Sequence, residues 1–236
     1  MALTAALPVS NWRSALTGRR LLWGLVMAIA AVYLGLVAAT VLLRWVDPFT
    51  TGVQMQRRVE SWFTKGKYQK RQVWVPLERV SPHMPHAVIA SEDGRFYQHH
   101  GIDWLAVEEV LEDAEEKGQI ARGASTITQQ LTKNLFFTTH RNPLRKLAEY
   151  TLAPVVDTVL GKHRVLELYL NVVEFGPGVF GIEAASQYHY GISASKLSRE
   201  QAARLTACLP APLRRKPARM NWFSNNIQER MKMMGW

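Results

Sequence analysis

Apolar residues are distributed in two ways along this chain of 236 residues. Between Leu21 and Leu43 no residue is charged, and these 23 residues would span about 34 Å as a helix, more than the roughly 30 Å of a bilayer core. The stretch is too long for the apolar part of a signal peptide, and no clear cleavage site follows it. We therefore expect a membrane anchor at residues 21–43, with residues 1–20 in the cytoplasm because Arg13, Arg19 and Arg20 precede it.

After the anchor, apolar residues recur with the spacing of helices, and signals for strands are sparse. Residues 44–75 are expected to form a membrane-proximal connector. Within it, residues 47–71 are polar and basic with scattered aromatics, typical either of an irregular or helical connector or of a segment lying against a membrane. Residues 72–77 have the character of a short strand, which Pro76 ends. From Pro85 onward the spacing is helical, with separate helices at 143–161 and 163–175 among others. Residues 76–236 are therefore predicted to form one mainly α domain.

One of these helices has a pattern that suits anion binding. Apolar residues recur at every fourth position from Ile127 to Leu135, and Thr126 with Gln129 fits a capping box at the start of the helix. A helix N-terminus with free N–H groups favours a phosphate, and Lys133 follows about two turns later. The alternative is an ordinary amphipathic helix with a solvated polar face. The spacing alone leaves both interpretations open.

The charge of the chain points to an anionic partner. Lys and Arg number 29 against 19 Asp and Glu, a formal net charge of +10, which suits nucleic acid, a phospholipid surface or a substrate with phosphate groups. A membrane anchor argues against nucleic acid. Arg145 and Glu149 are i, i+4 partners beside Lys146, which indicates either a surface ion pair or a basic patch that holds a diphosphate.

Glu167 is expected to be structural because it lies in a largely apolar helix. The single cysteine, Cys208, excludes an intrachain disulfide.

The stretch "SEDGRFYQHHGID", from Ser91 to Asp103, carries the remaining candidate chemistry. His99 and His100 are adjacent and lack the i, i+4 spacing of a zinc-protease helix, and the alternating oxygen ligands of a calcium loop are missing. Zinc and calcium sites are therefore not expected. Glu92 or Asp93 could act as an acid or base in a partly apolar pocket, and a polar surface turn remains the alternative.

Five motifs in order carry a resemblance to a known family: "EDGRFYQHHG", "RGASTITQQLTKN", "RKLAE", "LELYLN" and "GIEAAS". They resemble the motifs of the peptidoglycan glycosyltransferases, glycosyltransferase family 51, over about residues 76–217. One anchor and one domain resemble the layout of its monofunctional members. The resemblance implies a lysozyme-like, mostly helical fold with two lobes. It also implies that the enzyme polymerises lipid II with inversion, forming β-1,4 bonds and releasing undecaprenyl diphosphate.

The resemblance also implies roles for individual residues. It makes Glu92 the base and Glu149 a second glutamate that supports the diphosphate or its Mg²⁺ or Mn²⁺ ion. Cations replace a strong general acid on the departing diphosphate. The expected cations are Lys133, Arg141, Arg145 and Lys146, the expected cleft residues are Ser125, Thr126, Gln129, Gln130 and Asn134, and the expected loop supports are Asp93, Phe96, His100 and Gly101. The sequence departs from the family's usual pattern at Ile192, where a lysine is common.

The expected partners are lipid II, the growing lipid-linked glycan, the membrane, and cell-wall synthesis or division proteins. The expected location is the bacterial cytoplasmic (inner) membrane, single-pass, with the catalytic domain on the periplasmic side. Two other functions compete with this one. A lytic enzyme on a related fold would cleave the same glycan, and a non-enzymatic protein would bind anionic lipid or nucleic acid through its basic surface.

Overall fold

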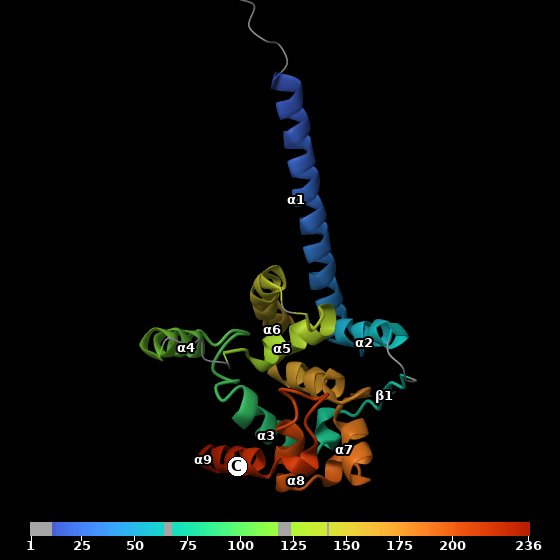
Figure 1. Ribbon diagram of the computed structural model, residues 1–236, viewed down its shortest axis with the longest axis vertical. Coiled ribbons are helices and arrows are strands. Elements are labelled where there is room, and N and C mark those ends of the chain that lie inside the picture. The colour runs from blue at the N-terminus through green and yellow to red at the C-terminus, as the bar shows by residue number, and fades with distance from the viewer. Residues whose placement is uncertain (1–10, 64–67, 118–123, 141) are drawn as a thin grey trace, which may run out of the picture. The chain divides into compact units, whose positions relative to one another are not determined.

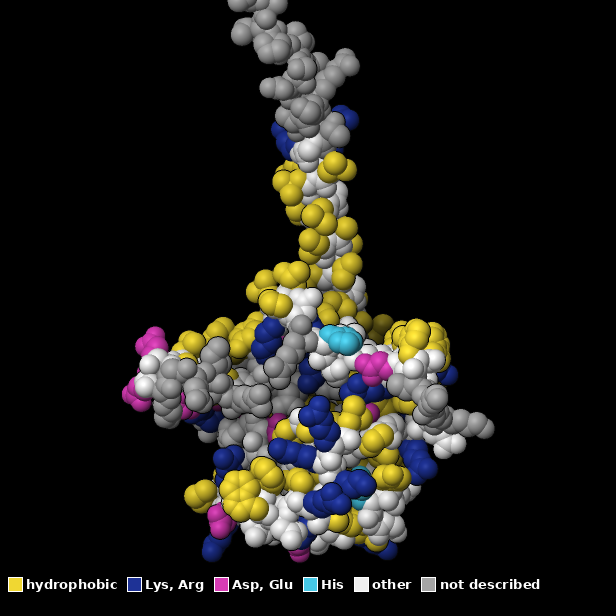
Figure 2. Space-filling model, viewed as in Figure 1, with side chains coloured by type: hydrophobic (Ala, Val, Ile, Leu, Met, Phe, Trp, Pro, Cys, Tyr) yellow, Lys and Arg dark blue, Asp and Glu magenta, His cyan; other side chains and the backbone are white. Residues whose placement is uncertain are grey.

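The computed structural model describes residues 11–63, 68–117, 124–140 and 142–236. The chain divides into two compact units, Met1–Ala39 and Thr40–Trp236. Helix α1, Asn11–Leu42, contains a segment of 25 residues, Gly18–Leu42, with a mean hydropathy of 2.5, long and apolar enough to cross a membrane (Figure 1). Hydrophobic side chains cover this helix on the face seen in Figure 2. The apolar helix predicted from the sequence is therefore present.

Helices dominate the described part of the second unit, and the prediction of a mainly α fold is confirmed. Its likeness to lysozyme stays a prediction. In chain order the elements are α2 (Gly52–Phe63), β1 (Arg71–Gln72), the 3₁₀ turn η1 (Leu77–Arg79), α3 (His83–Glu92), α4 (Trp104–Lys117), α5 (Ile127–Phe136), α6 (Pro143–Val172), β2 (Glu174–Gly176), β3 (Val179–Phe180), α7 (Ile182–Tyr190), η2 (Ala194–Lys196), α8 (Arg199–Thr206), η3 (Pro217–Arg219) and α9 (Asn221–Met233).

Two groups of helices form the core. Helix α5 packs along α6, and α3 packs against α8 and α9, as Figure 1 shows. Leu131 of α5 and Leu152 of α6 are buried, as are Met84 and Val88 of α3. Burying each such side chain contributes roughly 1.5–3 kcal/mol. The helices that carry the second and third motifs therefore lie side by side.

Helix α6 contains a break at Gly161, which has φ 75° and ψ 158°. A positive φ of this kind is available to glycine at little cost because it has no Cβ atom. The break divides α6 near the boundary between the two helices predicted at 143–161 and 163–175. It turns the second half of α6, which carries Glu167 and Tyr169, away from the direction of the first half.

The predicted strand at residues 72–77 is shorter than expected. Three short strands form a sheet of order β1-β3-β2, in which β1 is parallel to β3 and β2 is antiparallel to β3. Beyond Gln72, the side chain of Asn171 accepts the Val75 N–H (2.9 Å) and donates to its carbonyl (2.8 Å). Because this side chain takes the backbone groups that a neighbouring strand would need, pairing stops there.

Residues 44–75, predicted as a connector, belong to the same compact unit as the domain. The side-chain oxygen of Gln56 in α2 accepts the backbone N–H (2.6 Å) and the hydroxyl of Thr139. The Arg57 guanidinium lies 2.9 Å from the Glu174 carboxylate. A Cβ atom on Gly52 would come within 2.3 Å of the Phe137 carbonyl, so α2 approaches the end of α5 closely. These contacts pack the described residues of the segment against the domain, and the boundary at residue 76 stays a prediction.

Candidate active site

Helix α3 ends at Glu92, and the next residue fastens this end to α5. Asp93 leaves the helical conformation, and its buried carboxylate accepts the N–H of Ile127, the first residue of α5, at 2.9 Å. Its other oxygen lies 2.9 Å from Nε2 of buried His99, which must donate because an ionised carboxylate only accepts. A carboxylate at a helix N-terminus is also favoured by the helix dipole. Glu92 is therefore held next to the start of α5.

The loop that follows Glu92 is held by further contacts. Phe96 is fully buried, and Gly101 has φ 88° with the Ala153 carbonyl 2.6 Å from the place of a Cβ atom, so a larger residue would not fit. Arg95 forms ion pairs with Asp103 (2.7 Å) and with Glu109 (2.8 Å) of α4. Asp93, Phe96 and Gly101 thus lie as loop supports would.

The contact with Asp93 is made by His99, which was not among the predicted loop supports. His100 is exposed to solvent. The two histidines are neighbours in an irregular loop, where no periodicity distinguishes the inward residue from the outward one. His99 is thus an additional support, and the role of His100 stays a prediction.

Glu92 belongs to a hydrogen-bonded chain that reaches the core. Nε2 of Gln130 donates to Glu92 at 2.9 Å, and the hydroxyl of fully buried Tyr169 donates to Oε1 of the same amide at 2.8 Å. Burial raises the pKa of Glu92, while the Gln130 bond and the charge of Lys133 oppose that rise. A partly buried carboxylate with a raised pKa is suited to accept a proton. Tyr169 was not predicted as a site residue, because its position in the sequence is that of an apolar core residue.

A cluster of cations lies beside this carboxylate. Arg145 forms an ion pair with buried Glu149, whose other oxygen lies 3.5 Å from Nζ of Lys146, and Lys146 also donates to Ser125 at 2.9 Å. Burial lowers the pKa of Lys133, against the favourable charges of Glu149 and Glu92. The charge of Lys133 therefore interacts with both glutamates. Arg141, the remaining predicted cation, lies outside the described residues.

Some of the predicted residues line two cavities, and the Glu92–Gln130 hydrogen bond links the lining of one to the lining of the other. The Glu92 cavity, of about 280 Å³, is lined by Glu92 together with Ser125 and Thr126. The Lys133 cavity, of about 550 Å³, is lined by Lys133, Gln130, Asn134 and Tyr169 among others. An anionic group in the second cavity would therefore lie beside a carboxylate that opens onto the first.

Other predicted residues line neither cavity, among them Arg145, Lys146 and Glu149 of α6. Gln129 is buried and forms the predicted capping box with Thr126, with bonds of 3.1 Å in both directions, and it lines neither cavity. The capping-box prediction is confirmed, and the contribution of Gln129 is to begin α5. Ile192 follows the end of α7 and also lines neither of these two cavities.

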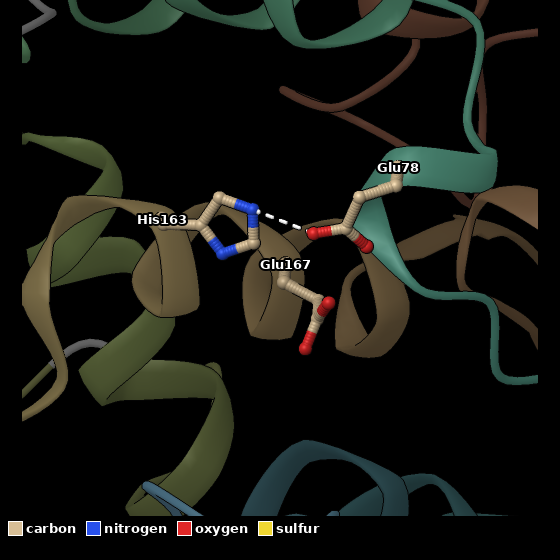
Figure 3. A group of neighbouring side chains, drawn as sticks. All are labelled: Glu78, His163 and Glu167. Atoms are coloured by element: carbon tan, nitrogen blue, oxygen red, sulfur yellow. Dashed lines mark ion pairs between the residues drawn. The ribbon is translucent and has the colours of Figure 1, made fainter.

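A second group of side chains has the spacing of metal ligands. Atoms of Glu78, His163 and Glu167 lie within 4.8 Å of one another, and Figure 3 shows the ion pair of 3.0 Å between His163 and Glu78. Glu167, however, already accepts the Leu77 N–H at 3.0 Å and an ion pair from Arg164. Its carboxylate is therefore satisfied without an ion, in keeping with the structural role expected for it.

The chain is similar over most of its length to proteins named biosynthetic peptidoglycan transglycosylase. It is 44% identical over 180 residues to that of Pseudomonas entomophila strain L48, which covers 76% of each chain. It is 48% identical over 159 residues to that of Nitrosospira multiformis, 67% of this chain and 69% of the relative. Residues 57–234 match the transglycosylase family. The resemblance carried by the five motifs is confirmed, and the chain belongs to the transglycosylase family.

Proposed function

We propose that this protein polymerises lipid II into linear glycan strands of peptidoglycan, forming β-1,4 bonds and releasing undecaprenyl diphosphate. The similarity to biosynthetic peptidoglycan transglycosylases supports the reaction. The observation that carries it in this chain is the pairing of a carboxyl whose pKa is raised, Glu92, with a neighbouring group of cations around Lys133. One accepts a proton and the other stabilises a departing diphosphate.

In this proposal Glu92 acts as the base. It takes the proton from the 4-hydroxyl of the acceptor sugar in the Glu92 cavity while that oxygen attacks the anomeric carbon of the donor. The bond between the anomeric carbon and the diphosphate oxygen breaks, and the diphosphate leaves with the bonding electrons. Lys133, Arg145 and Lys146 stabilise the negative charge, which makes protonation of the leaving group unnecessary. The Gln130 bond keeps the base ionised and directed.

A divalent cation is proposed as a cofactor that binds together with the diphosphate of the substrate. Glu149 is the predicted protein ligand, and the 3.5 Å between its Oε2 and Nζ of Lys146 leaves this oxygen the less tightly held of the two. One carboxylate beside two cations does not form a complete ligand set, so most ligands of Mg²⁺ or Mn²⁺ would be phosphate oxygens and water. Such an ion would add positive charge at the leaving group.

The proposed substrate is a lipid, so the enzyme must act at a membrane. We propose that α1 anchors the protein in the cytoplasmic membrane, with the N-terminus in the cytoplasm and the domain on the periplasmic side. Trp62 and Phe63 of α2 are 73% and 85% exposed, and Met55 and Val59 are exposed as well. Aromatic and apolar residues of this kind suit the membrane interface. Cell-wall synthesis or division proteins stay expected partners.

Incubation of the purified full chain in detergent with labelled lipid II tests the function. Long glycan should appear with the wild type and fall at least a hundredfold with Glu92→Gln. Glu108→Gln, which changes an exposed glutamate of α4 in the same way, should retain full activity. Normal polymerisation by Glu92→Gln would remove Glu92 as the base. Shortening of preformed glycan by the wild type would instead identify a lytic enzyme.

A further inference from the structure

A third cavity, of about 470 Å³, lies at the end of α7 and beside the loop that leads to η3. We call it the basic–aromatic cavity. Its lining contains three aromatic residues and three basic ones and no Asp or Glu: Tyr188, His189, Tyr190, Arg204, Arg215 and Lys216, beside glycine, proline, leucine and alanine. Lys and Arg side chains also gather over α8 and the neighbouring loops on the face seen in Figure 2. Such a lining is complementary to an anionic ligand with apolar parts.

Two of the three cations form no ion pair with a carboxylate among the described residues. Arg204 is neutralised by Glu200 at 2.7 Å. Arg215 donates to the Ala207 carbonyl at 2.7 Å and lies over the Phe223 ring at 4.5 Å, which holds the guanidinium in place without cancelling its charge. In the part of the chain that the structure describes, neither Arg215 nor exposed Lys216 forms an ion pair with a carboxylate. Two cations without a direct ion pair therefore line the cavity, and the charge of one of them, Arg215, also lowers the pKa of Glu92.

The hydroxyl of Tyr190 is a second, independent sign of a ligand. It is buried and has no hydrogen-bond partner among the described residues. Burial raises the pKa of Tyr190 to about 12, so the group keeps its proton and can donate. A buried polar group without a partner is costly, and native structures contain few of them. A carboxylate or hydroxyl of a ligand would supply the missing acceptor once the atoms that cover the hydroxyl move aside.

An aromatic wall completes the cavity. Tyr188 is 51% exposed, packs edge-on against His189 with ring centroids 4.8 Å apart, and carries the Arg71 guanidinium 5.1 Å above its ring. Its position is therefore fixed although half of its surface is open. A fixed, exposed tyrosine offers a flat apolar surface at a low cost in conformational entropy.

The basic–aromatic cavity adjoins the active site. Pro212 and Leu213 line both this cavity and the Lys133 cavity, so one loop separates the two. A ligand bound at Lys133 can therefore extend around that loop. An extended peptide of five residues reaches roughly 17 Å, because each residue spans about 3.3–3.6 Å.

We propose that the basic–aromatic cavity binds the acidic stem peptide of the glycan that occupies the Lys133 cavity. The inference rests on the proposed function, since only a substrate with both a sugar chain and a peptide would fill both cavities. Arg215 and Lys216 pair with the peptide's carboxylates, Tyr190 donates to one of their oxygens, and Tyr188 covers the apolar parts. The cavity is thus a specificity site for the peptide and holds no reacting atom.

Binding of a soluble disaccharide-peptide, without lipid or diphosphate, to the full chain in detergent tests the inference by calorimetry. The wild type should bind it, and an analogue with amidated carboxylates should bind at least tenfold more weakly. Lys216→Glu should weaken binding roughly tenfold, and Tyr190→Phe roughly fivefold, the effect of one hydrogen bond. Lys196→Glu, the same change at an exposed lysine that does not line the cavity, should bind as the wild type does.

Tyr190→Phe separates binding from folding. Removal of an unpartnered buried hydroxyl should leave the unfolding temperature unchanged or slightly higher, so weaker binding cannot be ascribed to instability. Equal affinity for the amidated analogue, or no binding by a wild type that polymerises lipid II, would overturn the inference and leave the proposed function intact. A third outcome is that the wild type binds the peptide through its carboxylates but does not polymerise lipid II. That result would contradict the proposed function and support the assignment of the cavity.

Discussion

Replacing Gln130 by methionine should make the activity more sensitive to acid. The change keeps the length of the side chain but removes the bond from Nε2 to Glu92 and the acceptor of the Tyr169 hydroxyl. The hydrogen bond from Gln130 favours the ionised form of Glu92. Loss of this bond therefore raises the pKa of Glu92 further and leaves less of the base ionised at low pH.

The size of the effect follows from the bond that is lost. A hydrogen bond to a charged group contributes about 1.5–3 kcal/mol. On the acid side of the pH profile the rate is proportional to the ionised fraction, so kcat/KM of Gln130→Met should fall there roughly ten- to a hundredfold. At the pH of maximum activity the base is ionised in both proteins, and the loss should be several times smaller.

The assay is polymerisation of labelled lipid II across the acid side of the pH profile, with kcat/KM at each pH. Tyr169→Phe is the matched control, because it removes the other bond of Gln130 and leaves the bond to Glu92 in place. Its acid side should coincide with that of the wild type. If Gln130→Met loses the same factor at every pH, the amide does not control the ionisation of Glu92, and the reasoning fails.

Three further predictions follow from the same site. Burial raises the pKa of Glu92, so the wild-type enzyme should lose activity on the acid side at a higher pH than an ordinary glutamate would give. Burial lowers the pKa of Lys133, so activity on the basic side should be lost at a lower pH than an ordinary lysine would give. A pH profile with both ordinary limits would contradict this. Asp93→Ala leaves two buried partners unsatisfied and should cost about 2–5 kcal/mol in thermal unfolding, whereas Asp93→Asn, which can still accept the Ile127 N–H, should cost less; equal losses would refute the role of that bond. A chelator should slow polymerisation without stopping it, since Lys133, Arg145 and Lys146 remain, and Mg²⁺ or Mn²⁺ should restore the rate; full activity in the chelator would exclude the metal.

The elements with regular periodicity could be predicted from the sequence. Apolar spacing indicated the helices, and the uncharged run at residues 21–43 indicated the long apolar helix α1. The start of α5 followed from Thr126 and Gln129, because a capping box is formed by residues only three positions apart. The order of the five motifs indicated Glu92 and the cations, since a family resemblance carries information that spacing does not.

The tertiary structure decided which residues meet. Nothing in the spacing of the loop after Glu92 distinguishes His99 from His100, because an irregular loop has no inward face before its contacts form. Tyr169 reads as a core residue in the sequence, and only the packing of α6 on α5 brings its hydroxyl to Gln130. The basic–aromatic cavity likewise joins Gly176 and Pro177, the end of α7 and the loop before η3, segments that are separate in the chain. Local patterns follow from neighbouring residues and are therefore present in the sequence, whereas a site built from distant segments exists only after the chain has folded.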